Sequence, residues 1–201
     1  MFHVKHEGWD LAARLDVELD EEAGEQLDRY ERLLVERAMP MGMIARADAP
    51  RVRERHVLDC LRAAPFLPDA GSVCDLGAGA GLPGVVLAIV RPDLRFVLVE
   101  VRRNRAAFLE VASSGLGNVI VHARRLETLR ERVDACTARA FAPSAQSWAA
   151  AASVLGPAGY LIYWAGASYD RTTDLPDGVS GRHFTTPALA RSGPLVIMAR
   201  Q

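Results

Sequence analysis

A run of glycines after a short apolar segment is the part of this sequence best suited to chemistry. Residues 73–84 read Val-Cys-Asp-Leu-Gly-Ala-Gly-Ala-Gly-Leu-Pro-Gly. The apolar segment predicts a buried strand, and the glycines predict a tight turn that lets a ligand approach the backbone. Pro83 is placed to open a helix, whose first N–H groups face that ligand. This stretch therefore predicts a nucleotide-type cofactor site at the carboxyl edge of a parallel sheet.

The glycine spacing separates two classes of cofactor. A dinucleotide fingerprint, Gly-x-Gly-x-x-Gly, sets a pyrophosphate on the helix N-terminus. Here Gly77, Gly79 and Gly81 alternate, and Asp75 stands two residues before the first. S-adenosylmethionine has no phosphate and needs carboxylate partners for its ammonium and ribose hydroxyl groups, for which Asp75 and Glu100 are placed. We therefore favour S-adenosylmethionine, and NAD is the alternative, because an acid at Glu100 also suits NAD.

The elements that must position these residues alternate along the chain. Strand-like runs cover 72–76, 95–100, 118–123, 133–138, 159–164 and 194–199, and helical segments cover 85–90, 102–114 and 144–155. The alternation predicts an α/β fold with a doubly wound, mostly parallel sheet. A seventh strand at 181–184 is too close to 194–199 for a crossover helix, so an antiparallel hairpin is expected at the edge. Two helical stretches are expected at 21–38 and 48–64. Residues 1–66 are therefore predicted to form an N-terminal tail and helical extension, followed by one compact domain at 67–201.

Composition excludes several classes of protein. Half of the 201 residues are hydrophobic, so an ordinary hydrophobic core is expected. The formal net charge is −1, so the protein is not basic overall. No apolar run reaches the roughly 18 residues of a membrane span. Cys60, Cys74 and Cys136 are interpreted as buried free thiols, with no metal site. We expect a cytoplasmic monomer that has no membrane partner.

The N-terminal peptide Phe2-His3-Val4-Lys5-His6 contains the only lysine of the chain. The codons ATG TTT CAC GTG AAA CA would encode Met1 to the start of His6. They contain TGTTTCACGTGAAACA, a palindrome similar to the partition site of bacterial chromosome-segregation proteins. The hypothesis is that the DNA sequence of this partition-like site, and not a function of the protein, determines the residues of this peptide. A metal site at His3 and His6 is the alternative, and it lacks further ligands.

Several motifs together resemble one known family. They are Arg55-His56-Val57-Leu58-Asp59-Cys60, Asp75 through Gly84, Leu87-Ala88-Ile89-Val90-Arg91-Pro92-Asp93, Asn104-Arg105-Ala106-Ala107-Phe108-Leu109, Arg125-Leu126-Glu127 and Ala138-Arg139-Ala140-Phe141-Ala142. The sequence resembles the bacterial 16S ribosomal RNA guanine-N7 methyltransferases, the small-subunit methyltransferase G family once called glucose-inhibited division protein B. The resemblance implies a Rossmann-like class I S-adenosylmethionine-dependent methyltransferase fold. It also implies methyl transfer to N7 of guanine 527, in the 530 loop of 16S rRNA in the 30S subunit.

The family pattern also implies site residues. Cofactor contacts are expected at Gly77, Leu82, Leu126, Glu127 and Arg139, with Glu100 on the ribose side. Leu126 and Glu127 would border the adenine; the alternatives are a core leucine and a solvated charge. Arg139 is the expected catalytic residue, and a structural ion pair is its alternative.

Contacts to RNA are expected from arginines beside the cofactor edge. They are Arg51, Arg53, Arg55, Arg102, Arg103, Arg105, Arg124 and Arg125, and the alternative is that they form solvated faces. His56 and Asp59 share one helix face and would close over the site, or His56 only packs. Many family members have a Lys-Gly where this chain has Ala165-Gly166, and an Asn-Leu-Thr where it has Gly42-Met43-Ile44. A catalytically weak or silent relative is therefore a second functional hypothesis.

Overall fold

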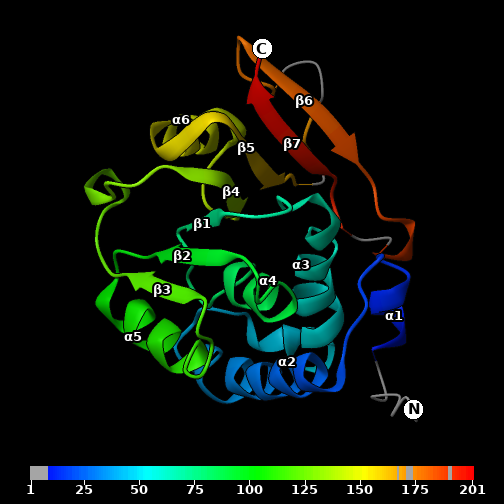
Figure 1. Cartoon of the computed structure of the whole chain (residues 1–201). Coiled ribbons are helices and arrows are strands. Elements are labelled where there is room, and N and C mark those ends of the chain that lie inside the picture. Colours follow the sequence, from blue (N-terminus) through cyan, green and yellow to red (C-terminus); the bar gives the residue numbers. More distant parts are fainter. Residues whose placement is uncertain (1–8, 167, 171–173, 190–191) are drawn as a thin grey trace.

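The computed structural model describes residues 9–166, 168–170, 174–189 and 192–201. These residues form one seven-stranded sheet in the order β3-β2-β1-β4-β5-β7-β6 (Figure 1). The strands are β1 Ser72–Leu76, β2 Arg95–Val99, β3 Val119–His122, β4 Val133–Arg139, β5 Leu155–Trp164, β6 Val179–Phe184 and β7 Leu195–Arg200. Neighbouring strands from β3 to β5 are parallel, whereas β7 is antiparallel to both β5 and β6. The predicted mostly parallel sheet with a C-terminal antiparallel hairpin is confirmed.

The helices lie between the strands and before them. They are α1 Asp10–Ala13, α2 Glu21–Leu33, α3 Asp59–Leu61, α4 Gly84–Val90, α5 Arg103–Ala112 and α6 Ser144–Val154. The 3-10 turns are η2 Arg46–Arg51, η4 Ala64–Phe66, η5 Leu126–Thr128 and η6 Pro187–Leu189, and the π-helical turns are η1 Leu34–Ala38 and η3 Arg53–Leu58. The single helix predicted over 48–64 is thus three short segments. Pro50 lies inside the first of them, where its missing N–H cannot continue an α-helical ladder.

The sheet is covered on both faces, and alternate residues of β1 divide between them. Val73 faces the core shared with α2, α4 and α5, whereas Cys74 and Leu76 face the core shared with α6. By the same alternation Asp75 points toward α4. This alternation decides how Asp75 is used in the site.

The N-terminal helices belong to the same core as the sheet. Trp9 beside α1, and Leu27 and Tyr30 on α2, are buried in one apolar cluster with strand residues such as Phe96 of β2. The three cysteines are free and buried, as predicted. Among the described residues, no helix is long and apolar enough to span a membrane. The peptide 2–6 lies outside the described residues.

The strand order reverses between β1 and β4, because the chain leaves β1 toward β2 on one side and reaches β4 on the other. In an open parallel sheet, ligands bind outside the carboxyl ends of the strands at such a switch point. Gly77 follows β1, Glu100 follows β2, and Arg139 ends β4. The fold therefore brings the predicted site residues to one edge.

Candidate functional site

The glycine loop is braced from beneath by Asp75. Its Oδ2 accepts a hydrogen bond from the Gly84 N–H (3.0 Å), and its Oδ1 accepts one from the Thr137 hydroxyl (2.8 Å). Asp75 is 1% exposed, and this burial raises the pKa of its carboxyl to about 7. Strand alternation turns the carboxyl toward α4, where both oxygens bond within the protein, and the ligand contact expected for Asp75 stays a prediction. We assign Asp75 to holding β1, α4 and β4 together.

The loop itself depends on glycine at two positions. Gly77 has φ +65°, and a Cβ there would lie 2.7 Å from Cδ2 of Phe141. Gly81 has φ +88°, and a Cβ there would lie 2.5 Å from Cγ2 of Val85 and 3.0 Å from the Tyr30 hydroxyl. The Tyr30 hydroxyl donates to the carbonyl of Ala80 (2.6 Å), so α2 supports the loop from the helical side. Gly81 thus faces the core, and a ligand can approach the loop near Gly77.

A small pocket of about 310 Å³ opens beside Gly77. It is lined by Leu76, Gly77, Val99, Glu100, Val101, Arg125, Leu126, Glu127 and Phe141. The ends of β1, β2 and β3 therefore bring together four of the predicted cofactor residues. Leu82 is 8% exposed and does not line this pocket.

Glu100 is oriented in the small pocket by backbone donors. Its Oε2 accepts from the Gly79 N–H (3.1 Å), and its Oε1 accepts from the Arg102 N–H (2.8 Å). A carboxylate offers about four lone-pair sites, so both oxygens keep acceptor capacity for ligand hydroxyls. Gly79 thus contributes to the small pocket indirectly, because its N–H orients Glu100. The sequence marks Gly79 and Gly81, with Gly77, as candidates for the cofactor site, and it does not indicate that Gly79 holds Glu100.

A large cavity of about 720 Å³ lies on the other side of the β4 end. Its polar lining includes Arg51, Glu54, Arg55, His56, Asp59, Arg62 and Arg139, and its wall includes Met43, Ala140, Trp164, Ala165 and Gly166. Arg51, Arg55, His56 and Arg139 were all predicted as site residues. The sequence does not indicate that they share one cavity separate from the cofactor loop.

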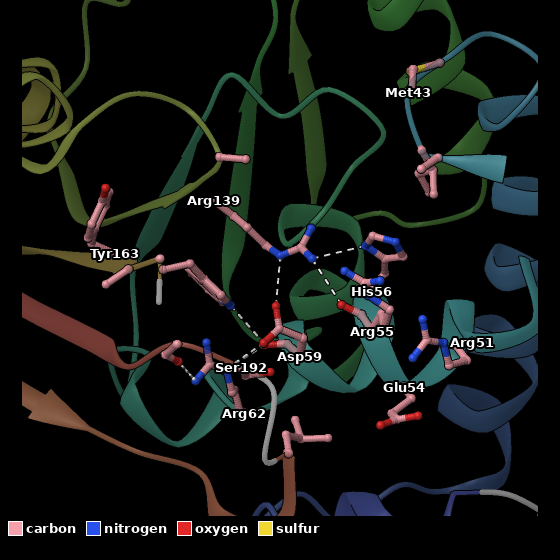
Figure 2. Close-up of a pocket in the computed structure, with 18 residues that line it drawn as sticks. Met43, Arg51, Glu54, Arg55, His56, Asp59, Arg62, Arg139, Tyr163 and Ser192 are labelled. Atoms are coloured by element: carbon pink, nitrogen blue, oxygen red, sulfur yellow. Dashed lines mark hydrogen bonds and ion pairs between the residues drawn. The ribbon is translucent and has the colours of Figure 1, made fainter. Parts of the chain in front are cut away.

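Arg139 reaches from the end of β4 toward Asp59, His56 and Arg55 (Figure 2). Its Nε donates to Asp59 Oδ2 (3.0 Å), and its Nη2 donates to the carbonyl of Arg55 (3.2 Å) and to His56 Nδ1 (3.1 Å). Asp59 also pairs with Arg62 (2.9 Å). The structural ion pair considered as the alternative for Arg139 therefore exists. Its Nη1 makes no hydrogen bond to any described residue, so this donor is available to a ligand.

The tautomer of His56 follows from its two neighbours. Arg139 has only donors, so His56 Nδ1 must accept and the proton lies on Nε2. Nε2 then donates to Asp48 Oδ2 (3.0 Å), while Asp48 Oδ1 pairs with Arg55 (2.8 Å). Burial, and then the charge of Arg139, lower the pKa of His56 from its ordinary value. His56 is therefore a neutral link between Asp48 and Arg139.

The remaining arginines divide among three environments. Arg102, Arg103 and Arg105 line a hollow of about 500 Å³ with Met41, Met43 and Asn104. Arg124 is exposed on the loop after β3, and Arg125 lines the small pocket. Arg53 is directed away from the cavities, because it pairs with Asp28 and Glu31 (2.7 Å each) and lies 4.3 Å from the Trp9 ring centroid. Arg53 therefore has a structural role in this fold, and the RNA contact predicted for it stays a prediction.

Three supporting residues were missed from the sequence. Asp48 is 7% exposed and holds both Arg55 and His56, Tyr30 holds the glycine loop, and Thr137 holds Asp75. A hydroxyl residue within the run Ala135-Cys136-Thr137-Ala138 was the available signal for Thr137. No local signal marks the partners of Asp48 or Tyr30, because these contacts join separate elements.

The fold and the glycine-loop site define a class I S-adenosylmethionine-dependent methyltransferase architecture. The O-methyltransferase TomG from Streptomyces achromogenes, solved with SAM, superposes with a TM-score of 0.58 at 17% identity and 92% coverage of both chains. Aeropyrum pernix fibrillarin with bound S-adenosyl-L-methionine gives a TM-score of 0.52 at 19% identity, covering 69% of this chain and 74% of fibrillarin. These similarities establish the fold alone.

The sequence comparisons identify the family. The family model described as rRNA small subunit methyltransferase G matches residues 23–175. Ribosomal RNA small subunit methyltransferase G from Acidothermus cellulolyticus is 40% identical over 141 residues, 69% of this chain and 64% of the relative. The Nocardioides protein of that name is 41% identical over 145 residues, 70% of this chain and 58% of the relative. This chain belongs to the rRNA small subunit methyltransferase G family, as the motifs predicted, and it spans less than two thirds of these relatives.

Proposed function

We propose that this protein transfers a methyl group from S-adenosyl-L-methionine to N7 of guanine 527 in the 530 loop of 16S rRNA. It would act as a monomer in the cytoplasm, with the 30S subunit as its partner. The observation that carries the proposal is the small pocket, where Gly77, Glu100, Leu126 and Glu127 meet at the ends of β1, β2 and β3. Family membership supports the acceptor, because the matching relatives are named small-subunit rRNA methyltransferases.

The residues of the small pocket fit this cofactor. Glu100 is a preoriented carboxylate for ribose hydroxyls, Leu126 offers an apolar surface for the adenine, and Gly77 lines the pocket without a side chain. The Nη1 of Arg139, across the β4 end, supplies a donor for a carboxylate such as that of a methionine moiety. When bound, the cofactor supplies an electrophilic methyl group on a sulfonium. The Gly79 and Gly84 N–H groups already donate to the carboxylates of Glu100 and Asp75, so these donors are not free for a pyrophosphate, which disfavours the NAD-dependent alternative.

The acceptor chemistry fits a site without a general base. Guanine N7 carries a free lone pair, so no proton has to be removed before it is methylated. The protein must then contribute mainly position and a favourable electrostatic environment. Arg139 suits this positioning role, because Asp59 and His56 hold its guanidinium in one orientation.

Labelled S-adenosylmethionine and unmethylated 30S subunits test the proposal, followed by mapping of the modified base. We expect label at N7 of guanine 527, and label at another base would refute the assignment. Tight binding of S-adenosylhomocysteine without any transfer would instead identify a catalytically silent relative. Binding of NAD, and not of S-adenosylhomocysteine, in calorimetry would overturn the cofactor.

A matched pair of variants tests the small pocket by calorimetry. Glu127→Ala removes a pocket carboxylate, and we expect S-adenosylhomocysteine to bind about tenfold more weakly if a charged hydrogen bond is lost. Glu110→Ala removes an exposed carboxylate from α5 and should leave the affinity unchanged. Equal affinities for both variants would remove Glu127 from the cofactor site.

A further inference from the structure

A further pocket, of about 280 Å³, lies at the edge of the sheet opposite the cofactor loop. Its lining residues Pro92 and Asn118 precede β2 and β3, and α2 packs on α4 beside it (Figure 1). Since β2 has five residues with a rise of about 3.3 Å each, this edge lies roughly 17 Å from the small pocket. We call it the acidic pocket, because its rim includes Glu18, Asp20 and Glu22, and its floor is apolar, with Ala88, Ile89, Val90 and Leu116.

The rim of the acidic pocket carries negative charge that the protein does not neutralise. Residues 18–25 read Glu-Leu-Asp-Glu-Glu-Ala-Gly-Glu, with five acids and no basic residue. Glu18, Asp20 and Glu22 are exposed and form no ion pair with any described residue. Asp20 caps α2 by accepting from the Ala23 N–H (2.8 Å), but a neutral serine or asparagine serves equally well as a cap. The structure of α2 therefore does not require this charge.

The side-chain amide donors in the lining are already used within the protein. The Gln26 amide donates to Glu22 Oε1 (3.1 Å). The Asn118 amide donates to three backbone carbonyls at and after the end of α4, at 3.0, 3.2 and 3.0 Å. Carboxylates are thus the main groups that the rim offers, and a matching ligand has to bring positive charge and hydrogen-bond donors.

Charge and size restrict the class of ligand. RNA is a polyanion, so carboxylates repel it. A metal ion is also disfavoured, because the described part of the chain has no group of three His, Cys, Asp or Glu side chains that could hold one. About 280 Å³ is below the roughly 300–1,000 Å³ of pockets that enclose a small molecule, and it suits one long side chain. Lysine and arginine fit both parts of the pocket, since their aliphatic stems cover apolar surface while their charged ends reach carboxylates.

We propose that the acidic pocket binds an Arg- or Lys-rich segment of a protein of the 30S subunit. The stem of a basic side chain lies against Ile89 and Leu116, and its cationic end lies at Glu18 and Glu22. The inference rests on the proposed function, in which the 30S subunit is the partner, and it adds a protein contact at the edge opposite the RNA contacts. Phosphates at the arginine-bearing edge and a basic protein at the acidic edge fix one orientation, because the reverse orientation brings like charges together.

Two matched pairs of substitutions on one chain segment test the pocket. Glu18→Gln with Glu22→Gln removes two charges from the rim, whereas Glu21→Gln with Glu25→Gln removes two exposed charges that do not line the pocket. The probe is a fluorescent peptide of alternating arginine and glycine, and fluorescence anisotropy measures its binding. We expect the rim pair to bind about tenfold more weakly and the other pair to stay within about twofold of wild type. The same affinity in both variants would overturn the proposal, since a general negative field does not distinguish them.

Cross-linking to purified 30S subunits identifies the partner. The photoreactive residue p-benzoylphenylalanine replaces Gly117 in the pocket lining, where a Cβ meets no atom within 4 Å, and in the control it replaces Arg182 on β6. We expect the probe at position 117 to cross-link to a 30S protein within an Arg- or Lys-rich segment, and the Glu18→Gln, Glu22→Gln background to reduce the yield. Cross-links to rRNA alone, the same products from both positions, or no cross-link would each refute the docking surface.

The outcomes distinguish this inference from the proposed function. Methylation of guanine 527 without a protein cross-link from position 117 would refute the docking surface and leave the activity in place. Failure to methylate that base would refute the proposed function, while peptide binding would still be measurable. Unchanged S-adenosylhomocysteine affinity shows that a variant is folded. If the rim pair does not fold, Glu22→Gln compared with Glu21→Gln decides the result.

Discussion

The buried carboxyl of Asp75 makes a specific prediction about stability and pH. Burial raises its pKa to about 7 in the folded state, whereas an unfolded aspartate titrates near 3.9. The folded protein therefore binds this proton more tightly than the unfolded chain does. The contribution of this carboxyl to the free energy of unfolding is then fully present below about pH 4 and is lost as the pH rises through about 7. Three pKa units correspond to about 4 kcal/mol, of which about 3 kcal/mol falls between pH 5 and pH 8.

Asp75→Asn removes this titration and keeps the neutral shape of the protonated acid. The asparagine Oδ1 can accept from the Gly84 N–H, and its Nδ2 can donate to the Thr137 hydroxyl. We expect the stability of Asp75→Asn relative to wild type to rise by about 3 kcal/mol between pH 5 and pH 8. Urea unfolding at pH 5, 6, 7 and 8 measures this difference.

Asp93→Asn is the control for the carboxyl titration. Asp93 is exposed, and its hydrogen bond to Arg91 lowers the pKa of its carboxyl. The trend for Asp93→Asn should therefore be small and of opposite sign. A stability difference between Asp75→Asn and wild type that does not change with pH would refute the reasoning. It would show that the two hydrogen bonds keep Asp75 ionised despite its burial.

Three further substitutions have expected outcomes. Tyr30→Phe leaves the buried carbonyl of Ala80 without its donor and should lower the free energy of unfolding, measured with urea, by about 1–3 kcal/mol. An unchanged midpoint would contradict the role of Tyr30 in supporting the glycine loop. Gly77→Ala should weaken S-adenosylhomocysteine about tenfold in calorimetry, because the methyl group meets Phe141 and φ is positive; adding Phe141→Ala should recover only the steric part. Ala165→Lys introduces the family's amine into the large cavity and should raise the initial methylation rate of 30S subunits several-fold by adding a phosphate contact; an unchanged rate would mean that the native arginines already suffice.

The sequence was sufficient for the order and type of most elements. Strand β1 has the predicted bounds, because an apolar run that ends at a glycine turn is a strong local signal. The region 48–64 was less predictable, since Pro50 and successive 3-10 and π-helical turns break a pattern that appears as one helix. Local patterns therefore describe regular segments well and irregular helical connections poorly.

By itself, the sequence determined the family, the doubly wound sheet and the position of the glycine loop that includes Gly77. The family follows from the resemblance of several motifs, and the sheet and the loop follow from local patterns of apolar residues and glycines along the chain. Only the tertiary structure decided which polar groups face one another. Arg139 meets Asp59 across 80 residues, and Arg53 turns to Asp28 although Arg51 and Arg55 line the cavity. Such contacts depend on which face of each strand or helix is buried, and packing between distant elements sets that orientation.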